Sequence, residues 1–160
     1  MDSGKILVAK KNGVYVLKLE GDVRLTICAA LEMFLEKMIL EPDLEAVFID
    51  LTDTIAVDST TLGFLAKISI QTKKKFNWIP TIITVNDDIT RVLMSMGFDQ
   101  VFDFINERID QPGNLEELNS LELGEDAMKG QVLEAHKILM GLNEQNRSKF
   151  KELIDVLEAS

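Results

Sequence analysis

The sequence predicts an α/β domain, in which helices pack on a mixed β-sheet, followed by a C-terminal α-helical extension. Three observations predict this class. Strand-like and helix-like segments alternate from about residue 5 to residue 108. The dipeptide Asn12-Gly13, between two short apolar runs, is the strongest short-range signal for a hairpin. After residue 110 only helical spacing of apolar residues remains.

With 160 residues and 46% hydrophobic content, the chain can bury one core. We expect a domain at 1–109, a linker with a short helix at 110–124 and a helical extension at 125–160.

The first half of the chain begins with the predicted hairpin, whose strands are residues 6–9 and 14–19. After the turn Gly21-Asp22, apolar residues recur at helical spacing over 27–38, and this helix should end before Pro42. Residues 46–51 form a nearly continuous apolar run, which is typical of a strand covered on both faces. We therefore expect that strand near the centre of the sheet.

The next segments continue the alternation. An apolar strand ending at Val57 leads into a helix over 59–76, and residues 79–85 form another buried strand. Side chains at 86–88 can cap a third helix over 89–96, which Gly97 would close. Residues 101–105 are a last short strand.

The tail beyond the turn-forming residues 110–114 carries no strand pattern. Leucines at 115, 118 and 121 favour a short helix, interrupted at Gly124. A helical stripe then runs from Met128 to Leu157, as one long helix or as two joined near residues 141–146. The stripe could pack on the domain itself, form a dimer contact or dock a partner. Asn146 would be costly if buried without a partner, so we expect it where the helix leaves its binding surface.

Charge and composition exclude several classes of function. A net charge of −10 argues against nucleic acid as a partner, because phosphate binding needs clustered Lys and Arg. The basic cluster at 73–75 complements the end of a helix. No run approaches the roughly 20 apolar residues that span a bilayer, so we expect a cytoplasmic protein without membrane contact. The single cysteine, Cys28, is interpreted as a small buried residue.

The stretch Asp58-Ser59-Thr60-Thr61 places three hydroxyl residues at the start of a predicted helix. Unpaired N–H groups and a partial positive charge at that position can hold a phosphate, which would add nearly two negative charges near Asp58. This pattern favours a phosphorylation switch. The simpler alternative is that Asp58 or Ser59 only caps the helix.

Catalytic sites find little support in the sequence. The single histidine, His136, lies in the tail and is interpreted as a partly exposed helix residue, and no Gly-x-Ser-x-Gly elbow is present. The carboxylates Asp50, Asp53 and Asp58 lack the spacing and the companions of a magnesium-dependent phosphotransferase. We therefore expect a non-enzyme without metal or cofactor, in which Ser59 is modified by another protein.

The order of elements, the Gly21-Asp22 turn and above all Asp58-Ser59-Thr60-Thr61-Leu62-Gly63 resemble the STAS domain of bacterial anti-sigma-factor antagonists over residues 5–108. In that family an Asp precedes the phosphorylated Ser, then Ser or Thr, then Gly-Leu-Gly. The resemblance implies that Ser59 is the phosphoacceptor and that Asp22 and Asp58 line the same surface. Thr61 stands where the family usually has Gly. The implied fold is a STAS-like mixed β-sheet with helices packed on it, plus the C-terminal α-helical extension.

The resemblance also implies a function. The unphosphorylated protein would bind an anti-sigma factor or Ser/Thr kinase, phosphorylation of Ser59 would release it, and a PP2C-type phosphatase would restore binding. The alternative is a STAS-like scaffold or ligand-binding module that docks partners through its C-terminal helix. The predicted partner surface consists of Asp22, Asp58, Thr60, Thr61, Leu62, Gly63 and Phe64.

Overall fold

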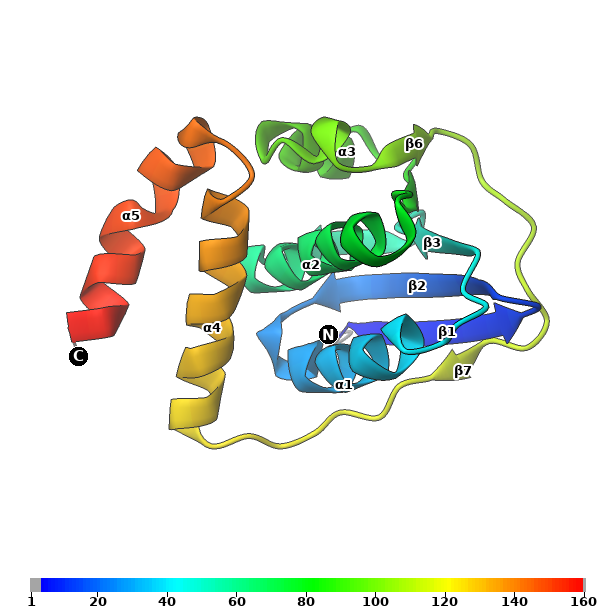
Figure 1. Ribbon diagram of the computed structural model, residues 1–160, viewed down its shortest axis with the longest axis horizontal. Coiled ribbons are helices and arrows are strands. Elements are labelled where there is room, and N and C mark those ends of the chain that lie inside the picture. Colours follow the sequence, from blue (N-terminus) through cyan, green and yellow to red (C-terminus); the bar gives the residue numbers. More distant parts are fainter. Residues whose placement is uncertain (1–3, 160) are drawn as a thin grey trace.

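The computed structural model describes residues 4–159 and confirms the predicted α/β class (Figure 1). The strand order is β6-β5-β3-β2-β1-β7, and β4 pairs with β2 beyond the end of β3. Strands β2, β3, β5 and β6 run parallel, whereas β1 is antiparallel to both of its neighbours. The strands are β1 Lys5–Lys11, β2 Val14–Val23, β3 Ala46–Asp50, β4 Thr54–Val57, β5 Thr81–Ile83, β6 Asp103–Ile105 and β7 Glu116–Glu117.

The hairpin turn forms as predicted, since β1 and β2 pair from Lys5↔Glu20 to Lys11↔Val14. Asn12 and Gly13 both have positive φ, 52° and 82°, as a two-residue turn matching the twist of the strands requires. The next apolar run is β3, which lies between β2 and β5, so its predicted central position is also confirmed.

Helices α1 and α2 lie against one face of the sheet and enclose the main core (Figure 1). Their positions match the predicted ranges, and α2 matches at both ends. Asn86 caps α3, and Gly97 follows that helix with φ 83°. The helical elements are η1 Leu25–Ile27, α1 Cys28–Ile39, α2 Ser59–Phe76, α3 Asp87–Ser95, η2 Phe98–Gln100, α4 Glu125–Met140 and α5 Glu144–Ala159.

The opposite face of the sheet holds a polar cluster at one end. Lys18 alternates with the core residues of β2 and is nevertheless almost fully buried. Its Nζ lies 2.7 Å from Asp53 Oδ2 and donates to Gln111 Oε1, while Gln111 Nε2 donates to Asp50 Oδ2. Hydrogen bonding from Lys18, supported by the nearby Arg108, lowers the pKa of Asp53 despite partial burial. Gln111 therefore holds the segment that follows β6 against this face of the sheet.

The prediction of a short helix within 110–124 is wrong. This segment is extended, with β7 pairing to β1 at Leu7↔Glu117 and Val8↔Glu116. The amide N–H of Leu118 also donates to the Ile6 carbonyl at 2.8 Å. The edge of β1 offers unpaired backbone groups, and an extended chain satisfies them while placing Leu118 against the core. The leucine spacing alone could not distinguish this arrangement from a helical turn.

The C-terminal extension forms two helices, α4 and α5, and packs on the domain instead of standing apart. The side chain of Asn143 restarts the helix, because its Oδ1 accepts from the Asn146 amide at 2.7 Å. The expectation for Asn146 is wrong, since this residue is fully buried. Its Nδ2 donates to the carbonyls of Met96 and Leu139, at 2.8 and 2.9 Å, and so fastens α5 to the end of α3.

Within residues 4–159, no helix combines the length and the apolar character that crossing a membrane requires.

Candidate functional site

Ser59 is the first residue of α2 and follows β4 after a single residue, Asp58. Strand β4 pairs in parallel with the end of β2, where the register shifts between Gly21 and Asp22. The Asp58 amide also donates to the Val23 carbonyl at 3.2 Å. Gly21 and Asp22 lie inside β2, so the turn predicted at these residues is wrong, and the pairing brings them to the same end of the sheet as the start of α2.

Asp58 is the N-cap of α2. Its Oδ1 accepts from the Thr61 amide at 2.8 Å, and its Oδ2 accepts from the Leu25 amide at 2.7 Å. One carboxylate therefore starts α2 and holds the short helix η1 beside it. Of the two residues that the sequence offered as caps, Asp58 performs this role, which leaves the Ser59 hydroxyl available for another contact.

Asp22 lies at the same end of the sheet and is partly exposed. Its Oδ2 accepts from Arg24 Nε at 2.9 Å, whereas its Oδ1 is buried without a hydrogen-bond partner. Asp22 and Asp58 thus contribute two carboxylates near the start of α2.

The remaining predicted partner-surface residues, Thr60 through Phe64, are buried in this conformation. Thr60 is 3% exposed and Thr61 fully buried, with its Oγ1 3.5 Å from Cys28 Sγ. Thr61 is part of α2, so the helix forms without the glycine usual at this position. Phe64 belongs to the main core. Only Asp22, Asp58 and Ser59 of the predicted site are partly exposed.

The Ser59 hydroxyl is hydrogen-bonded to His136, with Oγ and Nε2 2.7 Å apart. The other ring nitrogen, Nδ1, lies 2.7 Å from the Val132 carbonyl oxygen. A carbonyl only accepts, so Nδ1 carries a proton, and with the ring in this tautomer Ser59 donates to Nε2. His136 is 2% exposed and packs edge-on against Phe150. The predicted partial exposure of His136 is wrong.

The sequence carried a weak signal for this burial, since His136 follows Val132 by four residues and directly follows Ala135 on the apolar stripe. The partner could not be read from it, because Ser59 lies 77 residues earlier in the chain.

Two further contacts hold α4 on α2. A Cβ atom added to Gly63 would lie 2.4 Å from the Ala135 carbonyl oxygen and 2.6 Å from its Cα, so the absent side chain permits the two backbones to touch. One turn further along α2, Lys67 Nζ pairs with Glu134 at 2.7 Å and with Glu32 at 3.5 Å. Burial acts to lower the pKa of Lys67, but these two carboxylates outweigh it and raise the pKa above 10.5.

The carboxylates of Asp50, Asp53 and Asp58 have separate roles. Asp50 and Asp53 belong to the polar cluster with Lys18, and Asp58 caps α2. Among the described residues, no three His, Cys, Asp or Glu side chains gather in a way that could hold a metal ion.

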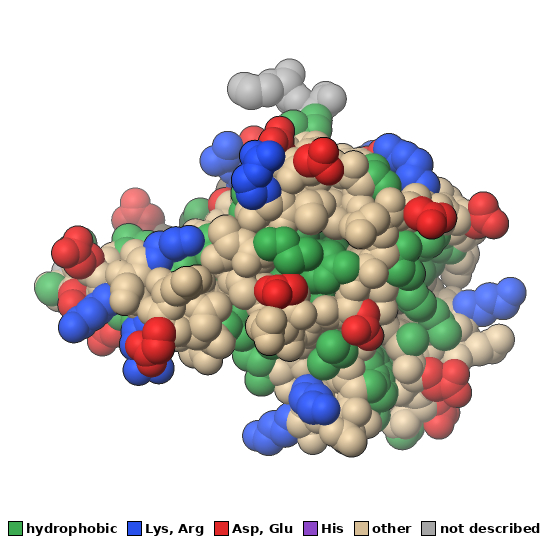
Figure 2. Space-filling view, turned by 90° about the horizontal axis from the view of Figure 1, so that it is seen from above, with side chains coloured by type: hydrophobic (Ala, Val, Ile, Leu, Met, Phe, Trp, Pro, Cys, Tyr) green, Lys and Arg blue, Asp and Glu red, His purple; other side chains and the backbone are tan. Residues whose placement is uncertain are grey.

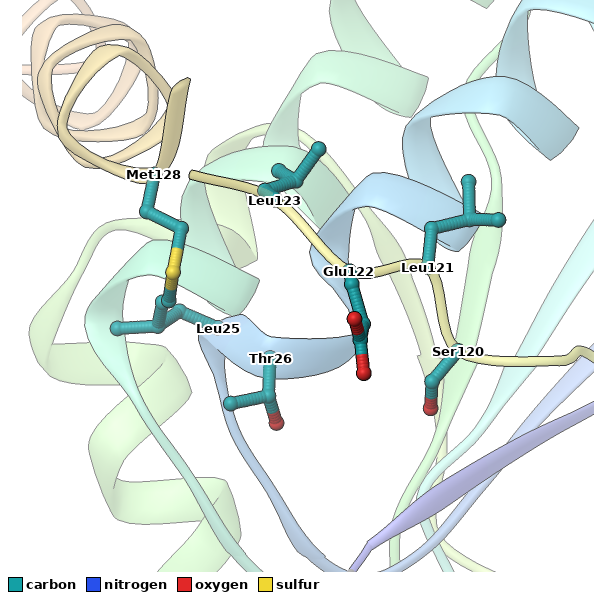
Figure 3. A pocket seen from close by; sticks show the side chains of 7 residues that line it. All are labelled: Leu25, Thr26, Ser120, Leu121, Glu122, Leu123 and Met128. Carbon is teal, nitrogen blue, oxygen red and sulfur yellow. The ribbon is translucent and has the colours of Figure 1, made fainter. Parts of the chain in front are cut away.

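A cavity of about 340 Å³ lies near this site, between η1 and the segment leading into α4 (Figure 3). Met128 reaches from α4 toward Leu25, and Glu122 supplies one carboxylate. Ser59 and His136 do not line it. The lining residues are Leu25, Thr26, Ser120, Leu121, Glu122, Leu123 and Met128.

Comparison with known proteins agrees with this geometry. A family model described as "Mlab, STAS domain" matches residues 6–106. The crystal structure of an anti-sigma factor antagonist from Mycobacterium paratuberculosis superposes with a TM-score of 0.54 and 21% sequence identity, covering 65% of this chain and 86% of that chain. A search of curated proteins found no match. The matched region contains every strand from β1 to β6, together with the start of α2 and Ser59. The chain therefore belongs to the STAS-domain family.

Proposed function

We propose that this protein is an anti-sigma-factor antagonist whose binding to its partner is controlled by phosphorylation of Ser59. The observation that carries the proposal is the position of Ser59. It is the first residue of α2, next to the capping carboxylate of Asp58, and it is the one hydroxyl of the 59–61 cluster that is partly exposed. Thr60 and Thr61 are buried, which disfavours them as acceptors.

A phosphate on Ser59 would have two physical effects. The unpaired N–H groups and the partial positive charge at the start of α2 can hold it without disrupting the helix. The same phosphate adds nearly two negative charges beside Asp58 and Asp22. A partner that docks on this surface when it is unmodified would lose close polar contacts and meet added charge, and such losses commonly cost a few kcal/mol.

The proposed cycle needs proteins other than this one. The partner is an anti-sigma factor, or a Ser/Thr kinase that also phosphorylates Ser59, and a PP2C-type phosphatase restores the binding form. The protein itself is a cytoplasmic non-enzyme in this scheme. The solved anti-sigma factor antagonist supports the proposal through its similar fold.

Calorimetric titration of the anti-sigma factor with two variants of Ser59 tests the proposal. Ser59→Ala should bind at least as tightly as the wild type, whereas Ser59→Asp should bind about 100-fold more weakly, because a few kcal/mol corresponds to that change in affinity. Ser95→Asp, on an exposed serine of α3, is the matched control and should have no effect. Equal affinities of the two Ser59 variants would contradict the proposed switch.

A second candidate is a STAS-like scaffold that docks partners through its C-terminal helix. The observation that favours it is the outer side of α5, where Val156 is 65% exposed and Leu153 40% exposed. Under this alternative, Val156→Glu with Leu153→Glu would abolish partner binding while Ser59→Asp would not. The phosphorylation switch predicts the reverse result.

A further inference from the structure

Helix α4 covers one face of α2, starting at the phosphoacceptor predicted from the sequence. Three residues of α2 that meet it are spaced by four, and so lie along one side of the helix. Ser59 bonds His136, Gly63 touches the backbone of Ala135, and Lys67 pairs with Glu134. Helices α4 and α5, which we name the lid, lie at one side of the sheet and its helices (Figure 1), although Ala135, Leu139 and Phe150 reach the main core. The end of the molecule that projects on the left of Figure 2 carries acidic and basic side chains.

The docked lid restricts what can reach Ser59. Its hydroxyl is engaged with a buried histidine ring, and the ring is packed against Phe150 of α5. A kinase must bring the acceptor oxygen into line with a phosphoryl group, which the Ser59–His136 contact prevents. The same helix occupies the side of α2 beside Gly63, so a partner cannot use that side while α4 is present.

The lid also contains features that weaken its attachment. Gln131 Oε1 and Asn146 Oδ1 are buried without hydrogen-bond partners, and an unpaired buried polar atom disfavours the state that buries it. Gly130 stands inside α4, where a Cβ would meet nothing within 4 Å. Packing therefore does not require glycine at this position, and a glycine makes the helix less stable than an alanine would.

We propose that the lid is displaceable and occupies, in cis, the surface of α2 on which a partner helix docks. Phosphorylation of Ser59 and partner binding then both require α4 to leave. This inference rests on the proposed function for the identity of the competing ligand, but the opening of the lid is a property of the chain alone. A competing helix must present a small residue over Gly63 and a carboxylate toward Lys67, as α4 does with Ala135 and Glu134.

Two substitutions should open the lid by overpacking the contact between Gly63 and Ala135. In Gly63→Ala, the new methyl group collides with Ala135, while alanine suits the interior of α2. In Ala135→Leu, the bulk is added on α4 instead, at a fully buried position against Gly63. Ala127→Leu, at an exposed position of α4, is the matched control. Gly130→Ala should act in the opposite direction by strengthening α4.

Hydrogen exchange of the full-length protein, followed by mass spectrometry, measures lid opening without any partner or kinase. Gly63→Ala and Ala135→Leu should each speed exchange in 125–159 by about tenfold or more, because overpacking at a close contact has an effect of this size. Ala127→Leu should leave exchange unchanged, and Gly130→Ala should slow it about fivefold. Exchange in β1 and β2 should stay constant.

The proposal is overturned if both opening variants exchange like the wild type. It is also overturned if exchange in β1 and β2 rises equally with exchange in 125–159, because α4 and α5 would then unfold only together with the sheet. In a second measurement, Ala135→Leu, which opens the lid and leaves the docking surface of α2 unchanged, should bind the anti-sigma factor about tenfold more tightly than Ala127→Leu. Absence of Ser59 phosphorylation would refute the proposed function but would leave the exchange result standing.

Discussion

Removing the hydroxyl of Ser59 should destabilise the protein through a residue far away in sequence. Ser59 Oγ and His136 Nε2 are 2.7 Å apart, and the ring is 2% exposed. Ser59→Ala leaves that ring nitrogen buried without a donor. A buried polar group that loses its partner costs about 1–3 kcal/mol, more than the net value of an ordinary hydrogen bond. We expect the free energy of unfolding to fall by about that amount.

A double-mutant cycle with His136→Phe separates this cost from other effects. Phenylalanine keeps an aromatic ring beside Phe150 and removes the nitrogen that needs a partner. The double variant should therefore be more stable than Ser59→Ala alone, since replacing both polar partners by apolar groups is nearly neutral. Urea unfolding followed by circular dichroism and by the fluorescence of the single Trp78 provides the measurement.

The control for this cycle is Ser95→Ala, on an exposed serine, which should change stability by less than about 0.5 kcal/mol. A Ser59→Ala variant as stable as this control, or a further loss of stability when His136→Phe is added to Ser59→Ala, would show that the Ser59–His136 hydrogen bond does not stabilise the protein.

Three other predictions concern parts of the structure around the site. Asn146→Asp places a carboxylate against the two carbonyls to which Asn146 now donates and should cost about 3 kcal/mol. Asn143→Asp keeps the capping oxygen and loses only a 3.5 Å contact of Nδ2 with the Met96 carbonyl, so it should cost less in the same urea assay. Burial raises the pKa of the Cys28 thiol to about 12, so at about pH 8 only roughly one thiol in ten thousand is ionised, and Cys28 should resist a thiol reagent until the protein is unfolded. The pKa of Asp53 is lowered from 3.8 chiefly by the hydrogen bond from Lys18. The ionised Asp53 therefore stabilises the fold at pH values above 3.8, and this stabilisation is lost as the pH falls through the lower pKa of the folded state. Lys18→Met should reduce the loss of stability between about pH 5 and pH 2.

Most of the domain could be predicted from local patterns. Asn12-Gly13 sets the hairpin, and continuous apolar residues mark β3. The boundaries of α2 agree because Asp58 caps its start and Asn77, with φ 63°, ends it. Each of these features is set by residues close together in the sequence or by the regular spacing of apolar residues, and both can be read without the fold. The extended path through β7 was missed because its partner is the edge of β1, which lies about 110 residues earlier.

The candidate site was predicted in part. Local sequence indicated Ser59 and its capping neighbour, and the structure places both at the start of α2. It could not indicate that α4 covers this start, because the contacts of Gly63 with Ala135 and of Ser59 with His136 join segments about 70 to 80 residues apart. The burial of Asn146 was missed for a similar reason, since the carbonyl of Met96 that satisfies it belongs to another part of the chain.

The proposed switch depends on phosphorylation of Ser59 in the cell. Intact-mass measurement of the protein recovered from its own cells, with and without phosphatase treatment, tests this most directly. We expect a species heavier by about 80 Da, the mass of one phosphoryl group, that disappears with phosphatase and maps by fragmentation to Ser59. A phosphoryl group on Thr60 or Thr61, or an unmodified protein both before and after activation of the pathway, would contradict it.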